Sequence, residues 1–341
     1  MKHIFLLIAA TILMGNLSFA QNNQKKAKEQ FNEAVDYIAI EDYDQAIYNL
    51  NSAINILPKF EEAYLERGKI YLKQQNTEKA EYDLNKAIKY ADEKGEAYFY
   101  RGYLNFEQGN IEQAIEDLTI SIQSGYKHAE AYYFRGLSYH KAEDYSNAIL
   151  NFTMAIDSKY DFFYAYHDRA TSKLKKGDFQ GAVKDYQTAL THNQGSAFTY
   201  NNLGKAYLKI SDFQKAIENF SLAIKKDPNY AEVYVNRGNA KTNLEKYDEA
   251  LSDYRKAIEI KPSLVKALNN IGIVYLEKGE FEEAIESFNK AIKKDSNLGQ
   301  AYLNRGLVWE NLGKFDKACD DWRMAQELGI EKAQEYLKDC E

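Results

Sequence analysis

The chain has 341 residues, of which 45% are hydrophobic and 28% charged, with a formal net charge of −7. It contains 28 Tyr but only 3 Pro, 2 Cys and 18 Gly. The apolar fraction excludes a disordered chain, two cysteines are too few for a disulfide-stapled mini-domain, and the glycine content excludes collagen. Length alone predicts two or three ordinary domains, but an array of repeats reaches this size without one large core.

Residues 1–20 have the organisation of a secretory signal peptide. Lys2 gives a basic start, residues 4–14 are apolar, and residues 18–20 form a small-x-small cleavage site before Gln21. The apolar run is too short for a membrane span, which is the less favoured reading. We therefore expect cleavage after residue 20, no membrane span in the mature chain, and an exported protein. Its location would be the periplasm in a Gram-negative bacterium and extracellular otherwise.

The charge balance argues against a nucleic-acid partner. Cleavage removes one lysine, so 43 basic residues remain against 51 acidic ones and the net charge becomes −8. The chain also lacks an arginine-rich arm or a basic stripe that could neutralise phosphates.

A period of 34 residues runs through the rest of the chain. One position is a small residue in every copy: Ala34, Gly68, Gly102, Gly136, Ala170, Gly204, Gly238, Gly272 and Gly306. Twelve residues later comes an invariable alanine: Ala46, Ala80, Ala114, Ala148, Ala182, Ala216, Ala250, Ala284 and Ala318. Small residues at these positions allow two helices to approach closely, and we expect large side chains to wedge between neighbouring repeats.

Large residues fall at helical spacings of three, four and seven around the small ones. On the second helix of each copy one position is always large: Leu50, Leu84, Leu118, Phe152, Tyr186, Phe220, Tyr254, Phe288 and Trp322. The three prolines share one position just past this helix, where a helix must stop: Pro58, Pro228 and Pro262.

The pattern resembles the tetratricopeptide repeat (TPR) family, in which each unit is a helix-turn-helix. The best copy carries the family signature at Tyr200, Leu203, Gly204, Tyr207, Ala216, Phe220, Ala223 and Pro228. Nine copies cover residues 27–332, after a short lead at 21–26 and before an expected capping helix at 333–341. The resemblance implies an all-α fold, a right-handed superhelical solenoid of antiparallel helix pairs.

Few residues remain for catalysis once the repeat is explained. The chain has no Gly-x-Gly-x-x-Gly motif and no P-loop, and its histidines stand alone without metal-ligand spacing. We therefore expect neither an enzyme nor a bound metal or cofactor.

Cys319 and Cys340 lie at equal distances from the turn expected near Gly329. Residues equidistant from the turn of an antiparallel helix pair lie side by side, so a disulfide fits the geometry, and an exported protein would allow it. The alternative, two buried reduced cysteines acting as small hydrophobes, has nearly equal weight.

The resemblance implies a concave groove lined by the first helix of each repeat. Two stretches differ along it. The third to fifth repeats present aromatic residues: Phe99, Tyr100, Tyr103, Phe106, Tyr133, Phe134 and Tyr164. The sixth to ninth repeats present an asparagine row at their sixth position: Asn202, Asn236, Asn270 and Asn304.

The asparagine row can bind the backbone of an extended peptide, because an amide both donates and accepts hydrogen bonds. The aromatic residues can form apolar pockets, where binding energy concentrates. Both sets also have a structural reading: asparagine is common at this position in the family, and aromatics at the fifth position can pack between repeats.

Charged residues also recur. Glutamates share the second position (Glu62, Glu96, Glu130 and Glu232) and predict an acidic lip, although such a row can be a solvated face. An arginine precedes the small residue in six repeats (Arg67, Arg101, Arg135, Arg169, Arg237 and Arg305), and we expect these arginines to bridge neighbouring repeats.

The favoured function is an exported, non-catalytic adaptor that binds a protein or an extended peptide in the groove. A carbohydrate-binding or cell-wall-associated module is the second reading, because sugars stack on aromatic faces. An accessory subunit of an envelope assembly or secretion complex is the third.

Overall fold

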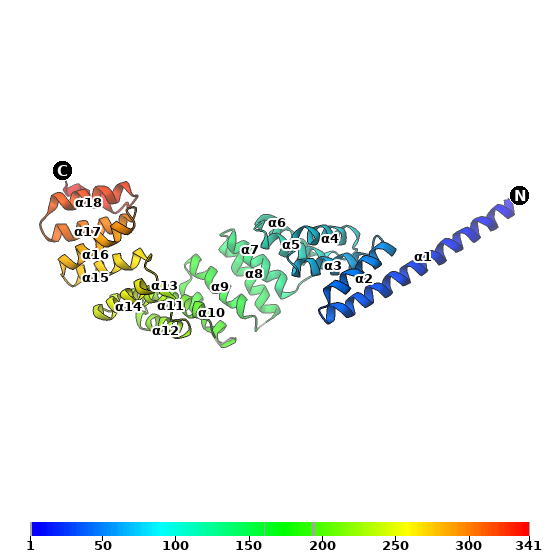
Figure 1. Cartoon of the computed structure of the whole chain (residues 1–341), viewed down its shortest axis with the longest axis horizontal. Coiled ribbons are helices and arrows are strands. Elements are labelled where there is room, and N and C mark those ends of the chain that lie inside the picture. The colour runs from blue at the N-terminus through cyan, green and yellow to red at the C-terminus, as the bar shows by residue number, and fades with distance from the viewer. Residues whose placement is uncertain (1, 160, 193–194, 341) are drawn as a thin grey trace. The chain divides into compact units, whose positions relative to one another are not determined.

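The computed structural model describes residues 2–159, 161–192 and 195–340. This part of the chain contains nineteen α-helices and one short 3-10 helix, with no strand (Figure 1). It divides into two compact units, one up to Ser172 and the other from Lys173 onward, so the boundary falls inside a helix. The all-α class is confirmed.

The first unit consists of helix pairs that follow one another along the chain. Its helices are α1 (Lys2–Ala39), α2 (Tyr43–Ile56), α3 (Glu61–Lys73), α4 (Thr77–Tyr90), α5 (Gly95–Glu107), α6 (Ile111–Gln123), α7 (Ala129–Lys141), α8 (Tyr145–Ser158) and most of α9 (Phe163–Lys176). Each of the pairs α1–α2, α3–α4, α5–α6 and α7–α8 packs together. The second helix of a pair also contacts the first helix of the next pair, as α2 contacts α3, α4 contacts α5 and α6 contacts α7.

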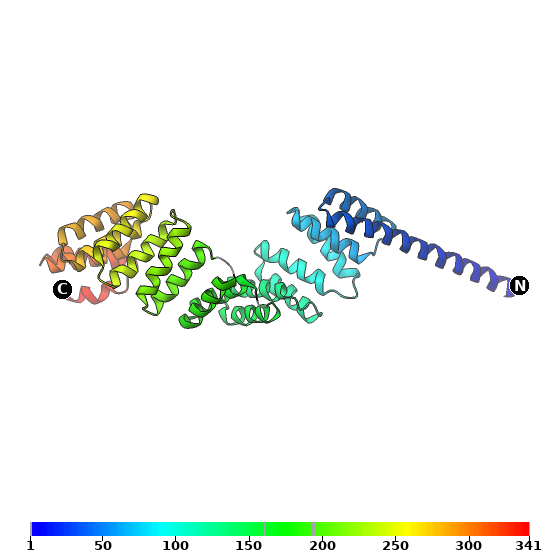
Figure 2. The same cartoon turned by 90° about the horizontal axis from the view of Figure 1, so that it is seen from below.

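The second unit repeats this arrangement and ends in a short cap (Figure 2). Its helices are α10 (Phe179–His192), α11 (Ala197–Lys209), α12 (Phe213–Lys226), α13 (Ala231–Asn243), α14 (Tyr247–Ile260), α15 (Val265–Glu277), α16 (Phe281–Lys294), α17 (Gly299–Asn311), α18 (Phe315–Glu327), α19 (Ala333–Tyr336) and the 3-10 helix η1 (Leu337–Asp339). The predicted stack of antiparallel helix pairs is confirmed within each unit.

The turn inside each pair ends the first helix in the same way. One residue of the turn adopts a left-handed conformation. This residue is Gly109 in one repeat, at φ +82°, and Glu143 in the next, at φ +60°. The following residue then donates to a carbonyl five residues back, as from the Asp144 amide to the Tyr139 carbonyl at 2.9 Å. The Asp144 carboxylate accepts from the Asn147 amide at 3.1 Å and caps the next helix.

The recurring glycine has a more specific role than a general close approach. It faces the large residue sixteen positions ahead, on the second helix of its own repeat. A Cβ on Gly272 would lie 2.6 Å from Cε1 of Phe288, and one on Gly238 would lie 2.5 Å from Cε1 of Tyr254. We expected large residues to pack between neighbouring repeats. This large residue instead packs directly on the glycine of its own repeat.

We expect Gly272→Ala to destabilise the eighth repeat by about 1–3 kcal/mol, since the buried Phe288 ring has to move. Gly68→Ala is the matched control, because its Cβ would meet Leu84 at 3.3 Å. Alanine is also the better helix former by about 1 kcal/mol. Local amide hydrogen exchange measures the stability of the repeat in each variant. Equal losses of protection in Gly272→Ala and Gly68→Ala would show that the Phe288 ring does not cause the destabilisation.

The arginine row bridges consecutive repeats, as expected. Arg237 donates from Nε and Nη2 to the Asp253 carboxylate of its own repeat, at 2.9 and 2.6 Å. Its Nη1 donates to Ser221 Oγ of the preceding repeat at 3.0 Å. The other arginines make the same sixteen-residue contacts forward, backward or in both directions: Arg67, Arg101, Arg135, Arg169 and Arg305.

Helix α1 runs without a break through residue 20, so the predicted cleavage site lies within a helix. Among the residues whose side chains the structure describes, no helix combines the length and the apolarity needed to cross a membrane. Cleavage of residues 1–20 stays a prediction.

Candidate functional site

The predicted groove aromatics form one connected cluster in the first unit. We define the aromatic cluster as the seven predicted residues with two more that touch them: Phe99, Tyr100, Tyr103, Phe106, Tyr133, Phe134 and Tyr164, together with Tyr126 and Phe162. Its members come from α5, α7 and the start of α9, and from the two connections that precede α7 and α9.

Phe134 is the centre of the cluster. Its ring centroid lies 4.8 Å from that of Tyr103, 5.5 Å from that of Tyr133 and 5.8 Å from that of Phe106, in edge-to-face geometry. Such contacts contribute about 0.5–1.5 kcal/mol each beyond the burial of area. The rings thus hold one another in place before any ligand binds.

The cluster has a buried and an accessible part. Phe99 is 7% exposed and belongs to the core, whereas the Tyr164 side chain is 58% exposed. Tyr100, Tyr103 and Phe134 are half-buried. The accessible tyrosines therefore present apolar rings with a polar edge, a combination that suits binding surfaces.

A polar network lies at one end of the cluster. The Tyr133 hydroxyl donates to Asp168 Oδ2 at 2.7 Å, and His167 Nδ1 lies 3.0 Å from Asp168 Oδ1. Burial first, and then the charge of Asp168, raises the pKa of Tyr133, so the hydroxyl stays protonated. The network fixes the ring of Tyr133 and contains no activated nucleophile.

The connections contribute residues that the sequence pattern did not single out. Tyr126 stacks on Phe99 with centroids 5.1 Å apart, and Phe162 lies 4.8 Å from Tyr133. Three other repeats carry a helix-stopping proline at the position of Tyr126. The aromatic residue in its place is the signal that would have identified Tyr126.

The asparagine row lies in the second unit, and three of its members donate to asparagines at other positions of the preceding repeat. Asn236 Nδ2 donates to Asn201 Oδ1 at 2.9 Å, and Asn304 Nδ2 donates to Asn269 Oδ1 at 3.1 Å. Asn270 Nδ2 donates in the same way to Asn239 of the preceding repeat, at 2.7 Å. The amides thus form a ladder between consecutive repeats.

The ladder changes what the row can offer a ligand. Asn202 and Asn304 are each only 7% exposed, whereas Asn236 and Asn270 are half-buried. Each amide keeps a second N–H and spare acceptor capacity. Peptide binding by the row stays a prediction, with Asn236 and Asn270 as its accessible members.

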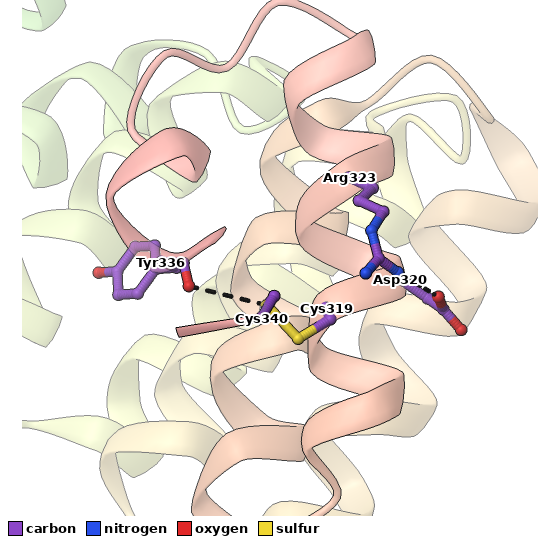
Figure 3. Close-up of a disulfide and its surroundings, with 5 residues drawn as sticks. All are labelled: Cys319, Asp320, Arg323, Tyr336 and Cys340. Atoms are coloured by element: carbon purple, nitrogen blue, oxygen red, sulfur yellow. Dashed lines mark hydrogen bonds and ion pairs between the residues drawn. A yellow bond between two sulfur atoms is a disulfide. The ribbon is translucent and has the colours of Figure 1, made fainter. Parts of the chain in front are cut away.

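The structure brings the two cysteines together as a disulfide (Figure 3). Cys319 lies on α18, Cys340 follows η1, and their Cα atoms are 5.7 Å apart. Between them Tyr336 stacks on Trp322 with centroids 5.1 Å apart. The bond and the stacked rings hold the C-terminal segment against the last repeat.

No metal-binding group of three or more His, Cys, Asp or Glu occurs within the described residues. At the aromatic cluster, His167 belongs to the polar network, and the ring centroid of His128 lies 4.2 Å from that of Tyr126.

Comparisons with known proteins agree with this architecture. Models described as tetratricopeptide repeat match residues 65–118, 101–159, 197–230, 229–296 and 269–328, and a model described as TPR repeat matches residues 36–75. No curated protein matches the chain.

Two of the matching solved structures give the same fold. A tetratricopeptide repeat protein from Parabacteroides merdae is 17% identical, with a TM-score of 0.60 over 72% of this chain and 97% of its own. The C-terminal part of a TPR repeat-containing protein from Cytophaga hutchinsonii is 18% identical, with a TM-score of 0.56 over 70% and 99%. MamA is 30% identical, with a TM-score of 0.43 over 48% and 96%. The predicted family is confirmed, and the chain belongs to the tetratricopeptide repeat family.

Proposed function

We propose that the chain is an exported, non-catalytic adaptor that binds a protein or an extended peptide on the aromatic cluster. Stacked helical repeats form extended binding surfaces, and the family generally serves as interaction scaffolds. The observation that carries the proposal is the accessible, pre-organised cluster on α5, α7 and α9.

The helix pair of a repeat forms without an aromatic residue at the sixth position. The sixth position of the repeat holds Tyr100 and Phe134 in the third and fourth copies but asparagine in the sixth to ninth. All these copies form the same helix pairs. Tyr100 and Phe134 are therefore available for a role other than forming the helix pair. Binding hot spots are enriched in aromatic residues.

Two observations support export. The first is the signal-like segment at residues 1–20. The second is the disulfide between Cys319 and Cys340, since structural disulfides persist mainly in oxidising compartments. Fractionation of the source cells tests this part: cytoplasmic protein that retains residues 1–20 would contradict it.

We expect truncation of accessible cluster residues to weaken partner binding. The variant Tyr103→Ala/Tyr164→Ala should lose at least about tenfold in affinity, because hot-spot truncations typically cost more than 1 kcal/mol each. The matched control is Tyr48→Ala/Tyr82→Ala, which removes two exposed tyrosines from α2 and α4. Partners are recovered on immobilised mature protein, and affinities are then measured with the purified partner.

The same experiment separates the remaining readings. Recovery of protein partners whose affinity drops only in the cluster variant supports the adaptor. Retention of the chain on purified wall or glycan, lost in the same variant, supports a carbohydrate-binding module. A stable multi-subunit envelope complex indicates an accessory subunit. Equal binding by the cluster variant and its control would contradict the aromatic cluster as the binding surface.

A further inference from the structure

A cavity of about 720 Å³ lies beside the aromatic cluster. It opens where α3 and α5 begin and where the connection from α6 to α7 passes them. The part of its lining that matters here consists of five carboxylates and one aromatic ring: Glu61, Glu62, Asp92, Glu93, Glu96 and Tyr126.

The carboxylates outnumber their counterions. Lys94 is the single lysine of the lining, and no arginine contributes to it. Within the described part of the chain, no ion pair joins Glu61, Glu62, Asp92 or Glu93 to a cation. Burial, and then the charges of Glu62 and Asp92, raise the pKa of Glu61. The described lining thus carries more negative than positive charge.

Tyr126 connects the cavity to the aromatic cluster. It lines the cavity and stacks on Phe99, whose ring lies 6.2 Å from that of Phe134. Burial raises the pKa of Tyr126 to about 12, so its hydroxyl adds no charge at neutral pH. A ligand that fills the cavity therefore contacts one member of the aromatic cluster, Tyr126.

Lys69 shows which group this environment accepts. Its Nζ donates to Glu66 at 2.7 Å and to Glu96 at 3.2 Å, and lies 5.1 Å from the ring centroid of Tyr100. Burial alone would lower the pKa of Lys69, but the hydrogen bond to Glu66 and the nearby charges raise it. A cation held between carboxylates and a tyrosine is thus already present beside the cavity.

We propose that the cavity binds an arginine side chain of a partner peptide whose neighbouring apolar residues lie on the aromatic cluster. A guanidinium is weakly hydrated, pairs with carboxylates through two parallel hydrogen bonds and stacks on aromatic rings. The negative cavity and the aromatic cluster have Tyr126 in common, so one basic, aromatic-rich segment can reach both. This inference rests on the proposed function and specifies the partner's chemistry.

The test uses the mature protein and a short fluorescein-labelled peptide of alternating Arg and Trp. A second peptide carries citrulline, which is nearly isosteric and uncharged, in place of Arg. The cavity variant is Glu61→Gln/Glu62→Gln/Glu93→Gln. Its matched control is Glu282→Gln/Glu283→Gln/Glu286→Gln, which removes equal charge and likewise alters two acidic residues in a helix's first turn.

Fluorescence anisotropy should show that the Arg peptide binds wild type and control alike, and the cavity variant about tenfold more weakly. The difference should shrink at high salt, and the citrulline peptide should not distinguish the variants. Equal affinity of the Arg peptide for cavity and control variants would overturn the inference.

The outcomes also separate this inference from the proposed function. If both peptides bind wild type and lose affinity in Tyr103→Ala/Tyr164→Ala but not in the cavity variant, the aromatic cluster binds peptides and only the arginine site is wrong. If wild type binds neither peptide, the inference is wrong, and the partner recovery described above decides the proposed function independently.

Discussion

Replacement of Arg67 by leucine should destabilise the repeat formed by α3 and α4 by about 3–5 kcal/mol, because it leaves a buried carboxylate without its counterion. Arg67 donates from Nε and Nη2 to Asp83, both at 2.7 Å, and the Asp83 side chain is 1% exposed. Its third hydrogen bond reaches Asn51 of the preceding repeat, so the loss should also loosen α2.

Two further variants isolate the cause. The double variant Arg67→Leu/Asp83→Leu should recover most of the stability, since no unpaired charge remains. Lys290→Leu breaks an exposed pair with Glu286 and should change stability by less than about 1 kcal/mol.

Hydrogen exchange of amides in α3 and α4 is the appropriate readout, because long repeat arrays do not unfold in a single step. Equal protection in Arg67→Leu and Lys290→Leu would contradict a buried, stabilising bridge.

Removal of the disulfide by Cys319→Ser/Cys340→Ser should lower the local stability of the last repeat by about 3 kcal/mol, the loop-closure value for about 20 residues. The stacking of Tyr336 on Trp322 remains but has to hold the segment alone. Since each repeat contacts only its neighbours, protection in α18 and α19 should fall while that in α11 and α12 stays unchanged.

A reducing agent should reproduce this loss in wild type and have no effect on the serine variant. Thiol titration of unfolded, unreduced protein gives an independent check. It should detect no free thiol, and two free thiols would contradict the bond.

The fold could be predicted because the same pattern of small and large residues occurs in all nine repeats. Gly238 and Tyr254 recur with their equivalents at fixed spacings, so the helix pairs follow from the sequence. Which large residue packs on the glycine did not follow, because the spacing gives the helix but not the rotamer. Glu143 in a left-handed turn was equally hidden, since only the recurring glycines mark that turn.

The grouping of the aromatic residues could be predicted in part, whereas their role in binding stays a prediction. The residues of the aromatic cluster are the ones the groove positions indicated, but Tyr126 and Phe162 come from connections that the repeat pattern does not describe. The amides of Asn236 and Asn270 were expected to face a ligand. They donate to asparagines of the preceding repeat instead, because the fifth, sixth and ninth positions meet across repeats.

The excess of tyrosine, 28 residues in all, has two origins. Most tyrosines serve the repeat, as Tyr254 does against Gly238. A smaller group lies in the aromatic cluster, where Tyr164 is exposed and Tyr103 is half-buried. The proposed binding of a partner depends on this second group of tyrosines.

Site-specific photo-crosslinking tests that account most directly. A benzoylphenylalanine at position 164 would report on the aromatic cluster, and one at position 82 on α4. Tyr164 and Tyr82 are 58% and 56% exposed, so the two probes are equally accessible. Partner protein or peptide should crosslink at position 164 and not at position 82. Crosslinking at position 82 alone would contradict binding on the aromatic cluster.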